Sequence, residues 1–287
     1  MNYLFKSLRP INLLMIFFTQ IIAVYFLGFK NSIVNIFDNL HLSIYISTVL
    51  TAAAAYIFND ITDRKCDEIN NPEKNFLSQI FYKKLFIVTY FILSLFALIV
   101  ALVTSVKLSI WVLFLQILLI LYNLLLKKLP ILGNILVSLI TAFSIYIFNI
   151  FDPNIKVNLV IIFSIYAFGI NLIREIIKDA EDIEGDSISG RYTFPVIAGY
   201  KATRILLLFL IFFYVLIVTT CVRLMVEKYF SYPLNLVFIT YNVVCIGFPI
   251  FHLSMKTQYA VDKNDFEYLG KIAKYVMVTG ILSMMFF

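Results

Sequence analysis

The sequence predicts an all-α protein, a multi-pass transmembrane helical bundle of about nine spans. Of the 287 residues, 62% are hydrophobic and only 14% are charged. The mean hydropathy is +0.93, and apolar runs long enough to cross a bilayer recur along the whole chain. In soluble domains, about a quarter of all residues are charged, so this composition excludes a soluble globular protein.

Nine spans are expected from the positions of the apolar runs. The first, from Ile11 to Leu27, is long and lacks a small-x-small cleavage site, so it predicts a membrane span rather than a signal peptide. The predicted spans are residues 11–27, 41–58, 84–105, 108–127, 131–151, 157–177, 203–225, 233–253 and 268–287. No Gly/Pro/Ser-rich linker separates them, so we predict a single membrane domain over residues 1–287 with an internal repeat.

The lysines and arginines predict the orientation. Of the 23 basic residues, 18 lie on one side of the predicted spans. Because basic residues concentrate on the cytoplasmic side, we expect a protein of the cytoplasmic (inner) membrane with its N-terminus in the cytoplasm and its C-terminus outside. The net charge of +6 then reflects orientation in the bilayer, and no nucleic-acid partner is expected.

The sequence lacks the motifs of several common metal-binding and catalytic sites. The cysteines Cys66, Cys221 and Cys245 have no paired or metal-binding spacing, so neither a disulfide framework nor a zinc site is expected. The chain also has no Gly-rich phosphate loop and no nucleophile elbow.

Two acidic clusters with identical spacing are the main functional signal. Asp60, Asp63 and Asp67 follow Asn59 at the end of an apolar run. Their spacing places them on one helix face, where like charges repel, so we expect cations to offset them. The same spacing returns in a second set: Asp179, Asp182 and Asp186. Both clusters lie in connections predicted to be cytoplasmic, so they can face each other across a shared opening.

Two facing carboxylate clusters above an apolar cavity predict a magnesium-dependent polyprenyl diphosphate site. Mg²⁺ binds through one or two carboxylates per ion together with waters and substrate phosphates. The metal would stabilise charge on the leaving diphosphate, and aromatic side chains would exclude water. The alternatives are a solvated loop and a cation-coupled membrane transporter, since intramembrane carboxylates also mark ion pathways. No charged residue clearly lies at mid-span to continue such a path.

Four segments together resemble the UbiA superfamily of intramembrane prenyltransferases. Residues 59–67, NDITDRKCD, fit its Asn-Asp-x-x-Asp-x-x-x-Asp motif, and residues 178–186, KDAEDIEGD, fit its second Asp-rich motif. Residues 122–127 together with Gly133 and Asn134 resemble its Tyr/Lys element, and residues 9–12 resemble its first-helix signature. The resemblance implies nine helices around a central cavity with a cytoplasmic cap.

The resemblance also implies roles for individual residues. The metal and, through it, the diphosphate of a polyprenyl donor would be bound by Asn59, Asp60, Asp63, Asp67, Asp179, Asp182 and Asp186. Phosphate oxygens would be neutralised by Lys127, Arg64, Lys178 and Arg191. Tyr122 and Asn12 would lie near the reacting end of the prenyl chain or the acceptor. One carboxylate of the second cluster could instead act as the base for the acceptor, and the sequence leaves its identity open.

The lipophilic acceptor is less defined. The run from Arg174 to Asp179 looks most like the branch that prenylates geranylgeranylglyceryl phosphate to build ether lipids. For that acceptor, Arg174 and Lys178 would bind an additional phosphate, and their alternative role is anchoring at the cytoplasmic side. Enzymes that prenylate 4-hydroxybenzoate or dihydroxynaphthoate in quinone biosynthesis share the metal site and remain the second candidate.

Overall fold

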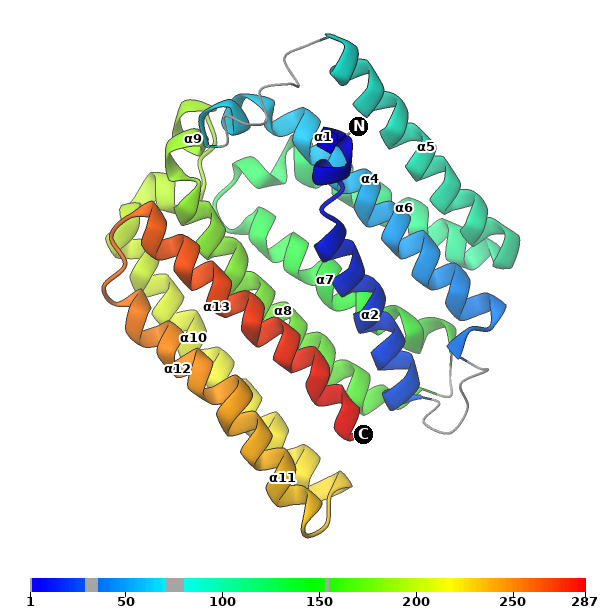
Figure 1. Ribbon diagram of the computed structural model, residues 1–287, viewed down its shortest axis with the longest axis vertical. Helices are drawn as coiled ribbons and strands as arrows, with labels where there is room; N and C mark the ends of the chain where they lie inside the picture. Colours follow the sequence, from blue (N-terminus) through cyan, green and yellow to red (C-terminus); the bar gives the residue numbers. More distant parts are fainter. Residues whose placement is uncertain (1, 29–35, 71–79, 153–154) are drawn as a thin grey trace. The chain divides into compact units, whose positions relative to one another are not determined.

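A computed structural model describes residues 2–28, 36–70, 80–152 and 155–287. Every regular element in these ranges is helical (Figure 1). The longer elements are α2 (Pro10–Leu27), α4 (Asn39–Asn70), α5 (Ile80–Thr104), α6 (Val106–Leu124), α7 (Leu132–Phe151), α8 (Val157–Glu181), α10 (Phe194–Tyr229) and α13 (Lys263–Leu282). The shorter ones are α1 (Asn2–Ser7), η2 (Leu126–Lys128), α9 (Ile183–Ile188), α11 (Leu234–Tyr241), η3 (Asn242–Gly247), α12 (Phe248–Thr257) and η4 (Ser283–Phe286).

The described ranges contain nine helical segments long and apolar enough to cross a membrane, which confirms the predicted number. These are Pro10–Leu27, Asn39–Arg64, Tyr82–Thr104, Val106–Lys128, Leu132–Phe151, Val157–Glu181, Phe194–Tyr229, Leu234–Thr257 and Lys263–Phe286. Two helices extend well beyond the apolar runs that predicted them. The second span was expected at 41–58, yet α4 continues to Asn70. The seventh was expected at 203–225, yet α10 runs from Phe194 to Tyr229, with a kink at Gly199, whose φ of 74° and ψ of 173° are not helical. Hydropathy detects only the membrane part of a helix, and backbone hydrogen bonding continues into the polar residues.

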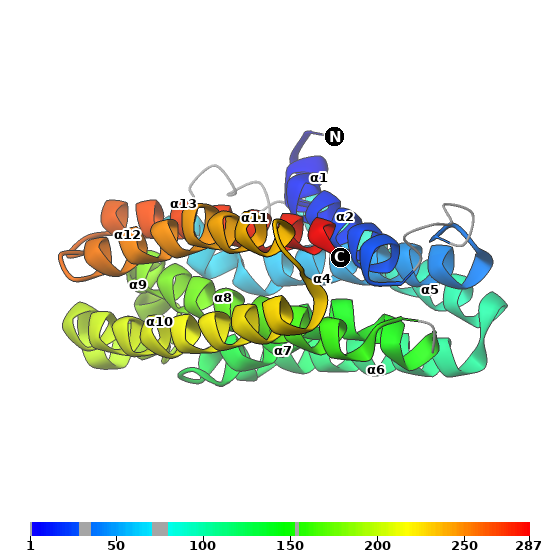
Figure 2. The same cartoon turned by 90° about the horizontal axis from the view of Figure 1, so that it is seen from below.

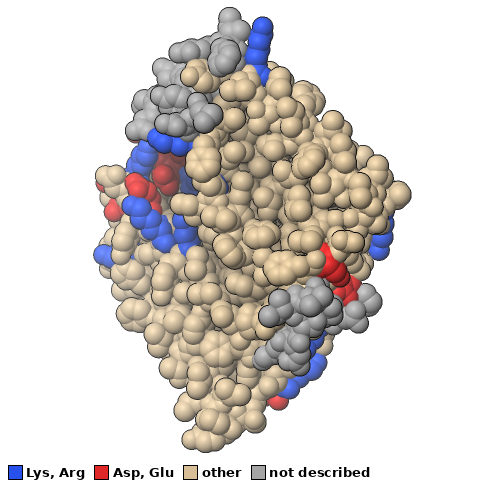
Figure 3. All heavy atoms as spheres, turned by 45° about the vertical axis from the view of Figure 1, so that its right-hand side comes forward, with Lys and Arg blue, Asp and Glu red and all other residues tan. Residues whose placement is uncertain are grey.

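The orientation predicted from basic residues stays a prediction. Lys30 and Lys74, which enter that count, lie outside the described residues. The surface agrees with a membrane environment: on the face in Figure 3, charged side chains are confined to a few groups. Large apolar side chains such as those of Ile92 and Val103 on α5 are exposed by 60% and 83%, as expected of side chains that face lipid.

The chain forms two compact units. Unit 1 comprises Met1–Ile21, Asn31–Gly133 and Glu184–Tyr192, and unit 2 comprises Ile22–Lys30, Asn134–Ile183 and Thr193–Phe287. The prediction of one domain with an internal repeat stays a prediction.

Unit 1 is built on three helices, α4, α5 and α6, that contact one another. Ile57 of α4 and Phe86 of α5 are fully buried in its core. Leu4 and Leu8 from the N-terminal segment pack against the same core. This packing fixes the start of the chain beside α4, just ahead of the residues that carry the first acidic cluster.

In unit 2, α8 contacts α10 and α13, and α12 contacts the same two helices (Figure 2). The close approach of α8 and α10 depends on Gly169. A Cβ added there would lie 2.5 Å from Cδ2 of the buried Tyr214 ring. The Tyr166 hydroxyl of α8 also donates a hydrogen bond to the Val218 carbonyl oxygen at 3.1 Å. Small residues allow membrane helices to pack at such short distances.

Replacing Gly169 by alanine is expected to destabilise unit 2, since the new methyl group overlaps the Tyr214 ring. Overpacking of this kind costs about 1–3 kcal/mol. The measurement is thermal unfolding of the purified protein in detergent. The matched control is Gly280→Ala on α13, where an added Cβ meets nothing within 4 Å. Equal melting temperatures for both variants would contradict this account of the α8–α10 contact.

Candidate active site

The first acidic cluster lies on one continuous helix, as predicted. Asp60, Asp63 and Asp67 all belong to α4. Asp60 is fully buried and Asp63 is 9% exposed, whereas Asp67 is half-buried. Buried carboxylates lose the solvation that stabilises their charge, so they require hydrogen-bond donors or cations nearby. The structure supplies these cations from three other segments of unit 1.

Lys127 is the first of these cations. It lies on η2, only 8% exposed, and its Nζ contacts the Asp63 Oδ1 atom. Nζ also donates to Thr62 Oγ1 at 2.6 Å and to Asn123 Oδ1 at 3.3 Å. The ammonium group therefore has three oxygen acceptors, which match its three N–H donors.

Arg191 is the second cation, and it joins the two acidic motifs. Its Nη2 contacts Asp63 Oδ1, and its Nη1 donates to Asp186 Oδ1 at 3.1 Å. Burial alone would lower the pKa of the Arg191 guanidinium, but Asp63 and Asp186 outweigh this effect and raise the pKa above its ordinary value. The Cys66 thiol also donates to Asp186 Oδ1 at 3.4 Å. Within unit 1, one carboxylate of the second motif thus lies beside the first motif.

Arg9 is the third cation, and it approaches Asp60. Its Nη2 lies 3.4 Å from Asp60 Oδ1, and its guanidinium carbon lies 4.9 Å from the centre of the Tyr56 ring. Burial lowers the pKa of Arg9, but the Asp60 carboxylate raises it, and the net shift is upward. Arg9 has a φ of 51° in the turn between α1 and α2. This left-handed conformation is unfavourable for a side chain with a Cβ, and the contact with the buried carboxylate offsets part of that cost.

Gly133 fixes the backbone that carries Lys127. A Cβ added at Gly133 would lie 2.9 Å from the Lys127 Cα and 3.0 Å from the Leu126 carbonyl oxygen. Only glycine lets the first turn of α7 approach η2 this closely. The position of the Lys127 ammonium therefore depends on a backbone contact as well as on its acceptors.

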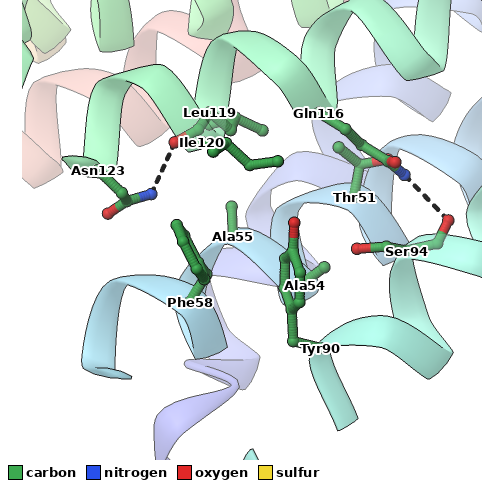
Figure 4. Close-up of a pocket in the computed structure, with 10 residues that line it drawn as sticks. All are labelled: Thr51, Ala54, Ala55, Phe58, Tyr90, Ser94, Gln116, Leu119, Ile120 and Asn123. Atoms are coloured by element: carbon green, nitrogen blue, oxygen red, sulfur yellow. Dashed lines mark hydrogen bonds between the residues drawn. The ribbon is translucent and has the colours of Figure 1, made fainter. Parts of the chain in front are cut away.

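A small pocket between α4, α5 and α6 adjoins this site at Asn123 (Figure 4). Asn123 Nδ2 donates to the Leu119 carbonyl oxygen at 2.8 Å, which leaves Oδ1 to accept from Lys127. Deeper in the pocket, Gln116 Nε2 donates to the Ser94 carbonyl oxygen at 3.0 Å. The amide orientation of Asn123 is thus set by its own helix, so its oxygen is preorganised toward the lysine.

The second acidic motif is divided between the two units. Asp179 and Asp182 belong to unit 2, and Asp186 belongs to unit 1. Asp179 Oδ2 accepts a hydrogen bond from Asn134 Nδ2 at 2.8 Å. Asp182 directly follows the last residue of α8, with φ −94° and ψ 8°. The three residues therefore do not share one straight helix, and the expectation that the two clusters face each other stays a prediction.

The remaining predicted residues lie on the same elements, and their roles stay predictions. Asn12 is on α2, Asn59, Arg64 and Asp67 are on α4, Tyr122 is on α6, and Arg174 and Lys178 are on α8; all are half-buried.

Sequence reasoning gave no role to four residues that contact the site or support it. They are Arg9, Thr62, Asn123 and Gly133. The position of Asn123, four residues before Lys127 on the predicted helix, was a usable signal, because residues at that spacing are neighbours on a helix. Gly133 belongs to the segment that resembles the Tyr/Lys element, but its close contact with the Lys127 backbone was not predicted.

The donor set fits a hard divalent cation. Carboxylate oxygens are the preferred ligands of Mg²⁺, and those of Asp63 and Asp186 are held close together by a shared arginine. In the described part of the chain, no three His, Cys, Asp or Glu side chains are grouped so as to hold a metal. The negative charge of Asp60, Asp63 and Asp186 is met by Arg9, Lys127 and Arg191.

The fold and the site define an integral membrane protein with buried carboxylates and cations at the end of its second span. The UbiA prenyltransferase family model matches residues 16–268. The chain therefore belongs to the UbiA prenyltransferase family and is a prenyltransferase.

Relatives and solved structures agree with this assignment. The chain is 29% identical over 287 residues to digeranylgeranylglyceryl phosphate synthase of Methanosphaera stadtmanae, covering 100% of this chain and 98% of the relative. A solved structure of digeranylgeranylglyceryl phosphate synthase in membranes has a TM-score of 0.69 at 19% identity and covers 98% and 97% of the two chains. A UbiA homolog from Archaeoglobus fulgidus, bound to GPP and Mg²⁺, has a TM-score of 0.66 at 16% identity and covers 98% and 99%. These likenesses give no specific support to the quinone-precursor alternative.

Thr62→Val is expected to lower kcat/KM for prenyl transfer, because it removes one of the acceptors that position the Lys127 ammonium. A hydrogen bond to a charged group contributes about 1.5–3 kcal/mol, which corresponds to roughly a tenfold loss or more. The control is Thr89→Val on α5, whose hydroxyl only donates to the Leu85 carbonyl oxygen of its own helix. Steady-state kinetics should separate the two variants, and equal kinetics would mean that Thr62 does not position Lys127.

Proposed function

We propose that this chain is a Mg²⁺-dependent intramembrane prenyltransferase that moves a geranylgeranyl group from its diphosphate to geranylgeranylglyceryl phosphate. The observation that carries the proposal is the buried set in which Asp63 contacts Lys127 and Arg191, and Arg191 also contacts Asp186. A likeness to a digeranylgeranylglyceryl phosphate synthase over the whole chain supports this choice of acceptor.

The charges suit a magnesium diphosphate. Three carboxylates of unit 1 already meet three cations, so the set is close to neutral. A diphosphate that binds together with a divalent cation adds charges of both signs. Its phosphate oxygens can pair with the cations of this set, and the metal ion can pair with the carboxylates. Lys127 and Arg191 would then transfer hydrogen bonds from Asp63 to phosphate oxygens, with Arg64 and Lys178 as further candidates.

Mg²⁺ would be held by Asn59, Asp60, Asp63, Asp67, Asp179, Asp182 and Asp186. When bound, the ion stabilises the negative charge that develops on the departing diphosphate. The allylic C–O bond of the donor breaks, and the electron pair remains on the diphosphate. The chain's own cations add to this stabilisation from fixed positions, which avoids reorganisation during the reaction.

The second half of the reaction forms an ether. The acceptor hydroxyl oxygen bonds to the allylic carbon, and its proton passes to one carboxylate of the second cluster, Asp179 or Asp182, which would then act as the base instead of binding Mg²⁺. Tyr122 and Asn12 would contact the reacting end of the prenyl chain or the acceptor. Aromatic side chains of the spans would keep water from the cationic carbon.

The first test is a product assay with the full chain in detergent, Mg²⁺ and geranylgeranyl diphosphate. Geranylgeranylglyceryl phosphate, 4-hydroxybenzoate and a dihydroxynaphthoate are offered in parallel and products are identified by mass spectrometry. We expect prenylation of the glyceryl phosphate, and loss of the product when a chelator is added. A prenylated aromatic would instead assign the chain to quinone biosynthesis. Solute or ion movement across sealed vesicles without any covalent product would support the transporter alternative.

Asp63→Asn is expected to reduce turnover by about 100-fold or more, because the neutral amide neither holds a divalent cation as a carboxylate does nor matches Lys127 and Arg191. The variant is assayed under the conditions above. The control is Asp262→Asn, an exposed residue that caps α13 by accepting from the Asp265 amide at 2.9 Å. Asparagine caps a helix as well as aspartate does, so this control should keep full activity. Full activity of the Asp63→Asn variant would show that Asp63 is not part of the active site.

A further inference from the structure

Three basic side chains lie near one another in unit 2, on two helices that pack together. Arg174 and Lys178 lie one turn apart on α8, and Lys274 lies on α13. The helices α8 and α13 are neighbours (Figure 1). The helices approach closely at Gly270, where an added Cβ would lie 3.9 Å from the Ile177 side chain. Lys274 is consequently within electrostatic range of both Arg174 and Lys178.

The other cations nearby have acidic partners. Arg174 Nη1 lies 2.6 Å from Glu175 Oε1 on the same helix. Lys271, one turn before Lys274, has its Nζ 2.8 Å from Glu267 Oε1. These pairs satisfy one basic group on each helix.

Lys274 has no such partner among the residues that the structure describes, since it makes neither a hydrogen bond nor an ion pair with them. The charged side chains that act on it include three bases, Arg174, Lys178 and Lys271, and one acid, Glu181. The three bases repel its ammonium group. A bound anion would relieve this repulsion.

The position of Lys274 along α13 is a second reason to expect a ligand there. It lies eleven residues after Lys263, the first residue of α13, which is about 16 Å along the helix axis. It is inside the span Lys263–Phe286. Ionisable residues in membrane spans are costly and mark substrate or ion sites. The competing explanation is that the flexible stem carries the ammonium to the membrane surface and binds no ligand.

We propose that Lys274, together with Arg174 and Lys178, binds the phosphate monoester of the acceptor lipid. This inference rests on the proposed function and adds a specificity-determining residue to it. A phosphate monoester carries about −1.5 to −2 charges near pH 7 and offers three acceptor oxygens. Three neighbouring cations can therefore distinguish it from a neutral lipid or a monoanionic aromatic acid, and an arginine can bind two of its oxygens at once.

The donor diphosphate is also an anion with phosphate oxygens, so these cations could bind either substrate. Two observations favour the acceptor. In unit 1, Lys127 and Arg191 already surround a carboxylate that fits Mg²⁺ chemistry, and they provide cations for the diphosphate. The cations of unit 2 lie beside Asp179 and Asp182, the candidate bases for the acceptor. We therefore assign them to the acceptor, and this assignment takes Lys178 from the candidates for the diphosphate.

The test is steady-state kinetics of Lys274→Ala in the full chain, with one substrate varied while the other is saturating. The KM for geranylgeranylglyceryl phosphate should rise about tenfold or more, as expected for losing one charged hydrogen bond. The kcat and the KM for the donor should stay within about twofold. Lys274→Arg should restore most of the acceptor affinity, and the control Lys271→Ala should leave it unchanged.

A second measurement separates this inference from the proposed function. Thermal stabilisation by geranylgeranylglyceryl phosphate, compared with geranylgeranylglycerol, reports binding without turnover. Wild type should be stabilised more by the phosphorylated lipid, and Lys274→Ala should lose that difference. If wild type makes no ether product, the proposed function fails, and this binding difference still decides the role of Lys274. A rise in donor KM alone, or an unchanged preference for the phosphorylated lipid, would overturn the inference.

Discussion

The structure of unit 1 depends on the pairing of buried carboxylates with cations that come from distant parts of the chain. Asp60 and Asp63 lie on α4, but their partners come from the first turn of the chain, from η2 and from the segment after α9. In a poorly solvated environment, leaving either side of such a pair alone is costly. The charges therefore hold four segments of sequence together around one end of α4.

The same pairing prepares the site for an anionic substrate. Lys127 is held by a hydroxyl, an amide oxygen and a carboxylate, and its backbone is packed against Gly133. Arg191 is bound at both Nη atoms. Cations held in this way can stabilise a leaving diphosphate without first being ordered, which is the electrostatic preorganisation that catalysis of group transfer requires.

In unit 2, the basic side chains of Arg174, Lys178 and Lys271 act on Lys274, which has no ion pair of its own among the residues that the structure describes. A prenyltransferase that joins two phosphorylated lipids must bind a diphosphate and a monophosphate and must treat them differently. The buried carboxylates of unit 1, which fit a divalent cation, suit the diphosphate, and the basic group of Arg174, Lys178 and Lys274 suits the monophosphate. The two sets of side chains would then distinguish donor from acceptor.

The sequence by itself determined the membrane class, the number of spans and the acidic motifs, because hydropathy and helical spacing are properties of neighbouring residues. It also predicted that Asp60 and Asp63 need cations, and the family resemblance named Lys127 and Arg191, though as partners of phosphate oxygens. Only the tertiary structure decided which cation meets which carboxylate, that Arg9 takes part, and that Thr62, Asn123 and Gly133 position Lys127. It likewise brought Lys274 of α13 beside Arg174 of α8, about a hundred residues earlier. Such contacts join residues far apart in the chain, and they depend on how helices pack, which local patterns do not encode.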